Sequence, residues 1–122
     1  MTLSKVEIIT SMAKVVALQE SFGRFGITGM TVTQVMGCGV QLGRQEYEDE
    51  KGKKHKMPKL LAKQIVMIVL PTEDVSKFLE FVKKELYTGH IGDGKIYISP
   101  VDNVVRARTG EEGLEALVEG EL

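Results

Sequence analysis

Residues 63–99, KQIVMIVLPTEDVSKFLEFVKKELYTGHIGDGKIYIS, carry the pattern that decides the fold. The nearly continuous apolar run over 63–70 predicts a central strand that is buried on both faces. Thr72 is a predicted helix N-cap, and 95–99 alternates as a second strand. Between them, apolar residues at i, i+3, i+4 and i+7 predict an amphipathic helix. Its buried face consists of Val75, Phe78, Leu79, Val82 and Leu86.

The N-terminal half repeats this strand–helix–strand order. Residues 5–10 are a β-type run, and the apolar spacing from Met12 onward predicts a helix that ends at Gly26. Residues 27–36 are rich in Thr and Val, which favours a strand. A further short strand is predicted at 104–109. The sequence therefore predicts one α+β domain over 1–122, a ferredoxin-like double split βαβ unit (βαββαβ) whose four-stranded antiparallel sheet is backed by two helices.

Composition and charge restrict the class of protein. The chain has 43% hydrophobic and 27% charged residues and a net charge of −1, which is ordinary for a soluble domain and gives no general attraction to nucleic acid or an anionic membrane. We expect no nucleic-acid partner and no direct membrane insertion. Cys38 is the single cysteine, so no internal disulfide can form. We expect a cytoplasmic protein.

Residues 41–60 and 110–122 differ from the rest of the chain. The first stretch is acidic and then basic, with Gly43, Gly52 and Pro58 as breakers. We interpret it as a mobile loop after the second strand, because a polar loop of this length in a compact domain is functional or disordered. The second stretch is predicted to be an acidic C-terminal tail.

The turn at Thr88–Lys95, TGHIGDGK, is the first candidate site. Its glycines allow close approach to backbone amides, and Lys95 adds a cation, a combination that suits phosphate oxygens. It is not a Walker A loop, because Ile96 replaces the Ser or Thr that holds magnesium and a strand follows in place of a helix. A purely structural glycine turn is the alternative.

Two further groups could contact an anion. Arg106 and Arg108 are one residue apart in a β-type segment, so both guanidinium groups should point the same way, either into solvent or toward a polyanion. The turn at 37–41, GCGVQ, is either a hinge or part of a phosphate site. No zinc-ligand cluster, hydrolytic triad or carboxylate pair stands out, and we expect no enzymatic activity.

These segments together resemble the PII signal-transduction (nitrogen regulatory protein P-II) family. The matching motifs are GITGMTVT at 26–33, TGHIGDGKI at 88–96 and RARTGEE at 106–112. The resemblance extends over nearly the whole chain. It implies a homotrimeric, non-enzymatic regulator that senses adenine nucleotides and 2-oxoglutarate.

The resemblance also implies where ligands bind. ATP or ADP would lie in clefts between subunits, with arginines contributed by the neighbouring chain. Gln41 would ligate Mg, and Gln41 with Lys63 would bind 2-oxoglutarate. The implied nucleotide-binding residues are Thr31, Gly37, Cys38, Gly39, Val40, Gln41, Gly92, Asp93, Gly94, Lys95, Arg106 and Arg108.

Two departures from the family pattern leave alternatives open. Val40 stands where the family has Arg, and the loop at 41–60, which matches the family's target-docking T-loop, has a different sequence around Tyr47. The implied target is a membrane transporter or a nitrogen-metabolism enzyme bound through this loop. The alternatives are a PII-like sensor of ADP, AMP or bicarbonate linked to carbon or other transport, and a trimeric metal-binding or scaffolding protein.

Overall fold

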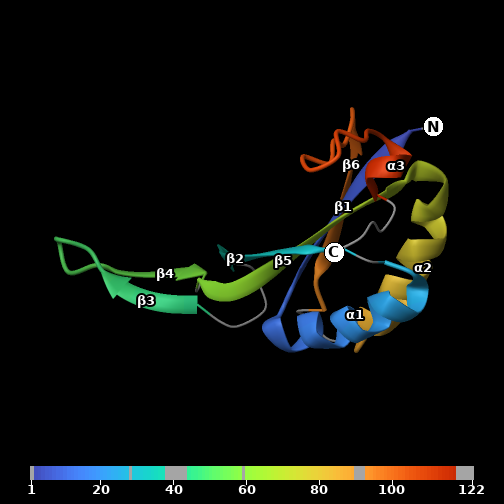
Figure 1. The fold of residues 1–122 in the computed structure, drawn as a ribbon. Coiled ribbons are helices and arrows are strands. Elements are labelled where there is room, and N and C mark those ends of the chain that lie inside the picture. The colour runs from blue at the N-terminus through green and yellow to red at the C-terminus, as the bar shows by residue number, and fades with distance from the viewer. Residues whose placement is uncertain (1, 28, 38–43, 59, 90–92, 118–122) are drawn as a thin grey trace.

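The computed structural model describes residues 2–27, 29–37, 44–58, 60–89 and 93–117, with the backbone alone at 44–47 and 56–58. Figure 1 shows a sheet with two long helices beside it and a two-stranded hairpin that extends away from the body. The elements in chain order are β1 (Leu3–Thr10), α1 (Met12–Phe25), β2 (Thr31–Gly37), β3 (Arg44–Glu48), β4 (Lys54–Pro58), β5 (Leu61–Pro71), the short 3₁₀ helix η1 (Thr72–Asp74), α2 (Val75–Leu86), β6 (Lys95–Val101) and α3 (Leu114–Leu117).

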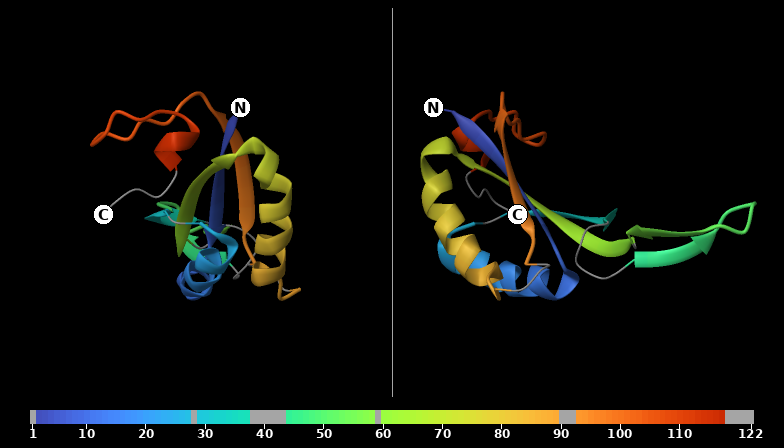
Figure 2. Two further views of the ribbon diagram at one scale, coloured as in Figure 1. Left: turned by 45° about the vertical axis from the view of Figure 1, so that its right-hand side comes forward. Right: turned by 180° about the vertical axis from the view of Figure 1, so that it is seen from behind.

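The main sheet has the strand order β2-β5-β1-β6, and every neighbouring pair is antiparallel. Helices α1 and α2 lie side by side against one face of this sheet (Figure 2). This order and layering are those of the ferredoxin-like double split βαβ fold. The predicted fold class is confirmed.

The core lies between the sheet and the two helices. The even-numbered residues of β1 and those of β5 from Gln64 onward are buried toward the helices, and Val6 and Val66 are fully buried, as the two-residue period of a strand requires. Phe22 of α1 and Phe78 of α2 meet over them, with their ring centroids 5.4 Å apart. The helix face predicted from spacing is confirmed, since most of its residues belong to this core.

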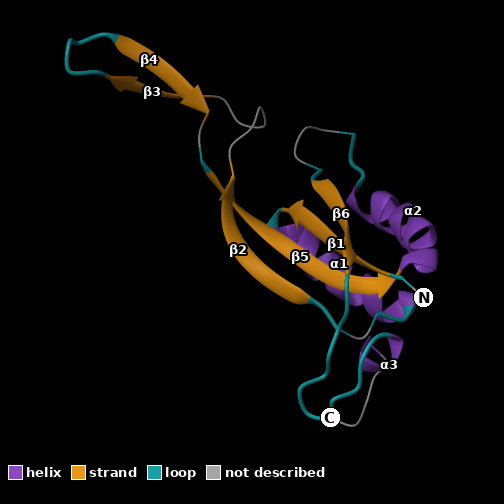
Figure 3. Cartoon of the chain, turned by 90° about the horizontal axis from the view of Figure 1, so that it is seen from above, coloured by secondary structure: helices purple, strands orange, loops and turns teal. Residues whose placement is uncertain are grey.

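The prediction that β5 is buried on both faces is wrong for the single chain. The strand is central, but only alternate residues are buried, while the residues between them, including Ile65, Met67 and Val69, remain partly exposed. Helices α1 and α2 cover the same face, and in the described residues no other helix of their length covers the opposite face, although the short helix α3 contacts β5 (Figure 3). This apolar outer face explains why the sequence of β5 lacks alternation.

The helix ends confirm one prediction and correct another. Gly26 ends α1 in the left-handed conformation, with φ of 99°, as predicted. Thr72 is not an N-cap: it begins η1, and its hydroxyl forms a 2.8 Å hydrogen bond with the hydroxyl of Ser4. Asp74 precedes α2 but its side chain does not cap the helix. The Thr72 hydroxyl is held by a tertiary contact instead of a local one.

Two other segments differ from the sequence prediction. Strand β2 begins at Thr31 and not at Ile27, because the Ile27 amide still donates to a carbonyl of α1, that of Phe22, at 2.9 Å. The segment 104–109 is not a strand; Val105 forms only an isolated bridge with Glu112, and a turn follows it. The short helix α3 lies in the stretch predicted as a tail.

Strands β3 and β4 form a hairpin within the stretch predicted as a loop. Its register sets Glu48 opposite Lys54, and Glu46 opposite Lys56 in the chain trace. Cross-strand pairs of opposite charge stabilise such ribbons. Among the described residues, no helix is both long and apolar enough to cross a membrane.

Candidate functional site

The glycine turn between α2 and β6 is closed by the Asp93 carboxylate. Its Oδ2 accepts hydrogen bonds from the backbone amides of Thr88 at 2.9 Å and Gly89 at 3.1 Å, and its Oδ1 accepts one from the Thr88 hydroxyl. The Thr88 hydroxyl and then the Thr88 amide hold the pKa of this carboxyl below its ordinary value. The carboxylate is thus engaged within the turn, and its predicted contact with a nucleotide stays a prediction.

Gly94 fixes the turn against the end of β1. Its φ is +117°, and a Cβ atom there would lie 2.6 Å from the carbonyl oxygen of Ile9. The Thr10 hydroxyl, which is buried, also donates to the Asp93 carbonyl at 3.3 Å. Only glycine fits this position without displacing backbone. Thr10 was not singled out from the sequence, because nothing local marks its contact 83 residues away.

The register of the sheet brings several predicted residues to one face. Lys95 lies opposite Ile9 of β1, Ile9 lies opposite Ile65 of β5, and Ile65 lies opposite Thr33 of β2. Residues in such a row point to the same side of the sheet. Because the adjacent even-numbered residues face the helices, this row lies on the outer face.

Lys63 and Thr31 share that outer face. Lys63 lies opposite Val35, and Thr31 lies opposite Met67. Lys63 passes beside Gly37, where an added Cβ would be 3.5 Å from the Lys63 Cγ. The end of β2, the start of β5 and the start of β6 therefore gather Lys63, Lys95, Gly37 and Gly94 at one end of the sheet.

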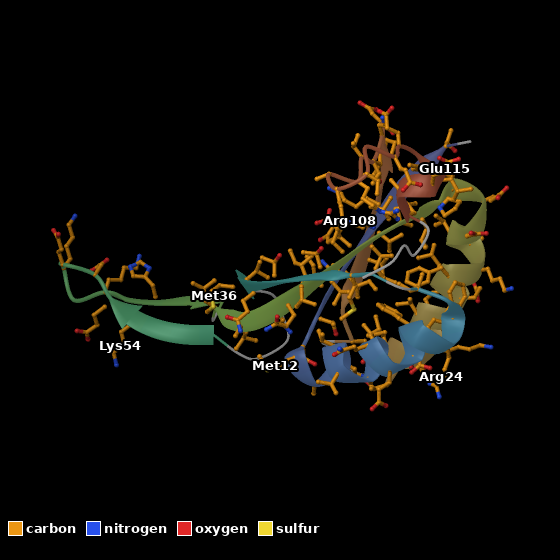
Figure 4. The ribbon with its side chains drawn as sticks, in the orientation of Figure 1. Met12, Arg24, Met36, Lys54, Arg108 and Glu115 are labelled. Carbon is orange, nitrogen blue, oxygen red and sulfur yellow. The ribbon has the colours of Figure 1, made fainter. Side chains whose placement is uncertain are left out.

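The two arginines are not at this end of the same chain. They follow β6, and the strand itself spans about 20 Å from Lys95 to Val101. Figure 4 shows Arg108 above the sheet, beside the C-terminal segment that contains Glu115. A single protomer thus separates the arginines from the glycine turn.

Arg106 and Arg108 also differ in their surroundings. Arg108 lies in an exposed turn, whereas the Arg106 side chain is only 20% exposed. Its Nη1 donates to Glu111 Oε1 at 2.9 Å, and its Nη2 donates to the carbonyls of Glu115 and Ala116 at 3.3 and 3.2 Å. The expectation of one shared face rested on a strand that is not present here. Glu111 was missed because its role depends on this fold-back.

Five predicted residues lie outside the described parts of the chain. They are Cys38, Gly39, Val40, Gln41 and Gly92. The predicted Mg ligand and one of the two predicted 2-oxoglutarate ligands, both Gln41, are among them. Within the described ranges, no group of three or more His, Cys, Asp and Glu side chains could hold a metal ion by itself.

Fold and site together define a ferredoxin-like domain with a projecting hairpin and cationic groups at both ends of its sheet. The sequence model of the nitrogen regulatory protein P-II family matches residues 3–111. The chain belongs to this family, whose members are signal-transduction regulators.

Individual relatives resemble the chain over nearly its full length. The nitrogen regulatory protein P-II of Cyanidium caldarium is 39% identical over 114 residues, 93% of this chain and 98% of that protein. The structure of the B. subtilis GlnK–ATP complex has a TM-score of 0.77 and 34% identity, with 95% and 98% of the two chains covered. Arabidopsis thaliana PII bound to citrate has a TM-score of 0.75 and 31% identity, with 94% and 92% covered.

Proposed function

We propose that the protein is a cytoplasmic, non-enzymatic regulator that binds ATP or ADP in the clefts of a homotrimer. Mg and 2-oxoglutarate bind with the nucleotide, and residues 41–60 engage a target, a transporter or a nitrogen-metabolism enzyme. The proposal is supported by family membership and by the ATP complex of B. subtilis GlnK.

One observation carries the cleft assignment: the chain holds its cationic groups at opposite ends of one sheet. Lys63 and Lys95 are near the glycine turns, while Arg106 and Arg108 follow the far end of β6. A phosphate chain held by both groups therefore needs two protomers. The turn side fits phosphate, because Gly94 has no room for a side chain and Asp93 has its carboxylate engaged in the turn.

The outer face of the sheet supports the trimer. Ile9, Ile65, Met67 and Val69 are only partly buried there, since the long helices α1 and α2 pack on the other face. Covering this apolar surface with other copies of the chain would stabilise an assembly through the hydrophobic effect. It would also bring the outer-face lysines next to a neighbouring protomer.

Lys63 is the residue proposed to bind the distal carboxylate of 2-oxoglutarate. Its stem lies beside Gly37, at the entry to the second glycine turn. The citrate complex of A. thaliana PII shows that a relative of this fold binds a polycarboxylate. Mg would offset the combined charge of the phosphates and the dicarboxylate, with Gln41 as its protein ligand.

The β3–β4 hairpin is proposed to be the target-binding element. It projects from the body (Figure 1). Its sequence has glutamates in β3 and lysines in β4. A partner with complementary charge of both signs would fit this ribbon. Ligand binding at residues 37–41, which lead into the hairpin, would change its position.

Isothermal titration calorimetry tests the proposal. We expect ATP and ADP to bind the wild-type trimer, and Arg106→Ala or Arg108→Ala to weaken binding by roughly tenfold or more, since each removes a charge-assisted contact. Arg24→Ala is the matched control, because Arg24 lies on the last turn of α1, where it donates to Ser21 at 3.0 Å. Equal nucleotide affinity in all four proteins would contradict the cleft assignment.

A second titration separates the ligand alternatives. With Mg present, 2-oxoglutarate should tighten ATP binding in the wild type but not in Lys63→Gln. Failure of 2-oxoglutarate to affect the wild type, with ADP, AMP or bicarbonate binding instead, would favour the carbon-linked sensor. A trimer that binds none of these ligands would favour a scaffolding or metal-binding role.

A further inference from the structure

The guanidinium group of Arg106 is bound by the C-terminal segment of its own chain. Nη1 contacts Glu111 Oε1 at 2.9 Å, and Nη2 contacts the carbonyl oxygens of Glu115 and Ala116 at 3.3 and 3.2 Å. The last two carbonyls belong to α3. Both terminal nitrogens of Arg106 thus donate to oxygen atoms that follow it in the chain by five to ten residues.

The backbone reinforces this fold-back. The Arg106 amide donates to the Glu111 carbonyl at 2.8 Å, and the Gly110 amide donates to the Arg106 carbonyl at 2.7 Å. Gly110 has a φ of 76°, which suits the reversal of the chain. The Gly113 amide then donates to the Val104 carbonyl at 2.9 Å. Glu111 is therefore presented to Arg106 by a closed turn and not by a chance surface contact.

Carboxylate and carbonyl oxygens are the same kind of hydrogen-bond acceptor as phosphate oxygens. A guanidinium group binds a phosphate with two parallel N–H donors. In Arg106 the N–H groups of Nη1 and Nη2 are directed at the oxygens of Glu111, Glu115 and Ala116, and the Glu111 carboxylate offsets the positive charge. A phosphate that binds Arg106 through both Nη1 and Nη2 competes with these acceptors.

We propose that residues 111–117 are an internal competitor for Arg106, which the phosphates of a bound nucleotide displace. This inference rests on the proposed nucleotide-binding function and adds a regulatory role for the C-terminal segment. When Arg106 turns to the phosphates, Glu111 and α3 lose their shared partner. The segment then loosens, so that its order depends on whether the cleft is occupied.

Glu111→Gln tests the competition, and Glu112→Gln is the matched control. Both substitutions remove one negative charge from adjacent positions. Glu112 contacts Asn103 Nδ2 at 2.9 Å, a contact that glutamine can keep, whereas Glu111 contacts Arg106. We expect Glu111→Gln to tighten ATP binding by roughly two- to fivefold, the effect of one partly exposed ion pair, and Glu112→Gln to leave it unchanged. Calorimetry on the full-length trimer measures both.

Hydrogen exchange gives an independent readout. The Ala116 amide donates to the Gly113 carbonyl at 3.1 Å within this segment, and ATP should accelerate its exchange in the wild type. Three results would overturn the inference and leave the proposed function standing. They are unchanged or weaker ATP binding in Glu111→Gln, an equal gain in ATP affinity in both variants, and slower exchange of the Ala116 amide when ATP binds. If the wild-type protein does not bind ATP, both the inference and the proposed function are wrong. The calorimetric titration of the wild type with ATP identifies this case.

Discussion

The Asp93 carboxylate accepts a hydrogen bond from the Thr88 amide at 2.9 Å and another from the Thr88 hydroxyl, and so closes the turn between α2 and β6. This contact gives the turn its shape before any ligand binds. It also directs the carboxylate into the turn, where it accepts from Thr88 and Gly89. Lys95 can thus lie beside the proposed phosphate site although the turn contains an acidic residue.

Thr88→Val is expected to raise the pKa of Asp93 toward its ordinary value of 3.8, because the Thr88 hydroxyl is the largest cause of its depression. The sign for stability follows from linkage. A carboxyl whose pKa is lowered on folding stabilises the turn fully above pH 3.8, and this contribution is lost as the pH falls through the folded-state pKa. Carboxyl-carbon NMR titration of Asp93 in both proteins measures the shift. An identical titration curve would contradict the assigned cause.

Gly94→Ala is expected to destabilise the protein more than Gly26→Ala. Both glycines have positive φ, +117° and +99°, so both variants incur backbone strain of about 1 kcal/mol. At Gly94 the new Cβ would also meet the Ile9 carbonyl at 2.6 Å, whereas at Gly26 nothing lies within 4 Å. The clash should add about 2 kcal/mol. Urea unfolding of the two variants at equal protein concentration gives the difference, and equal losses would rule out the close approach.

The main sheet and its helices could be predicted because their signals are local. The spacing of Val75, Phe78 and Val82 predicts the buried helix face, and all three are in the core. The glycine at 26 ends α1 as its residue type suggests. In both cases the residues that decide the structure are close together in the sequence.

The errors arose where a distant contact decides the structure. The Thr72 hydroxyl bonds to Ser4, 68 residues away, and not to its own helix. The segment around Arg106 pairs with Glu111 and α3 and not with the sheet. The sequence did not predict strands β3 and β4, because neither has the alternating apolar pattern of a half-buried strand. Their register instead sets opposite charges across the hairpin, such as Glu48 opposite Lys54.

Ile65→Lys is expected to dissociate the proposed trimer. Ile65 lies in the middle of the outer face, between Ile9 and Thr33 in one row, and Lys95 lies in the same row. A buried lysine without an acidic partner would cost several kcal/mol at each interface. Val16→Lys, at a position 59% exposed on α1, is the control and should leave the assembly intact. Light scattering after size-exclusion chromatography measures the mass of both, and a trimeric Ile65→Lys would contradict the proposed packing face.

The turn of the hairpin depends on Asp49, and this dependence gives the last prediction. Asp49 Oδ1 accepts from the amides of Lys51 and Lys53, each at 2.9 Å, and Oδ2 contacts His55 Nε2 at 2.8 Å. The hydrogen bond with His55 is the largest of the causes that lower the pKa of Asp49. His55→Ala should raise that pKa toward 3.8, so that turn stability is lost at a higher pH as the solution is acidified.

Asp49→Asn should weaken the turn at neutral pH, because the carboxylate that anchors three groups becomes a neutral amide. The expected result is faster exchange of the Lys51 and Lys53 amides and weaker NMR contacts between β3 and β4. Glu50→Gln removes the same charge from the next residue of the turn and should leave this exchange unchanged. If Asp49→Asn and Glu50→Gln accelerate exchange equally, net charge governs the turn and the specific contacts do not. If the hairpin is the target-binding element, only Asp49→Asn should also weaken binding of the target.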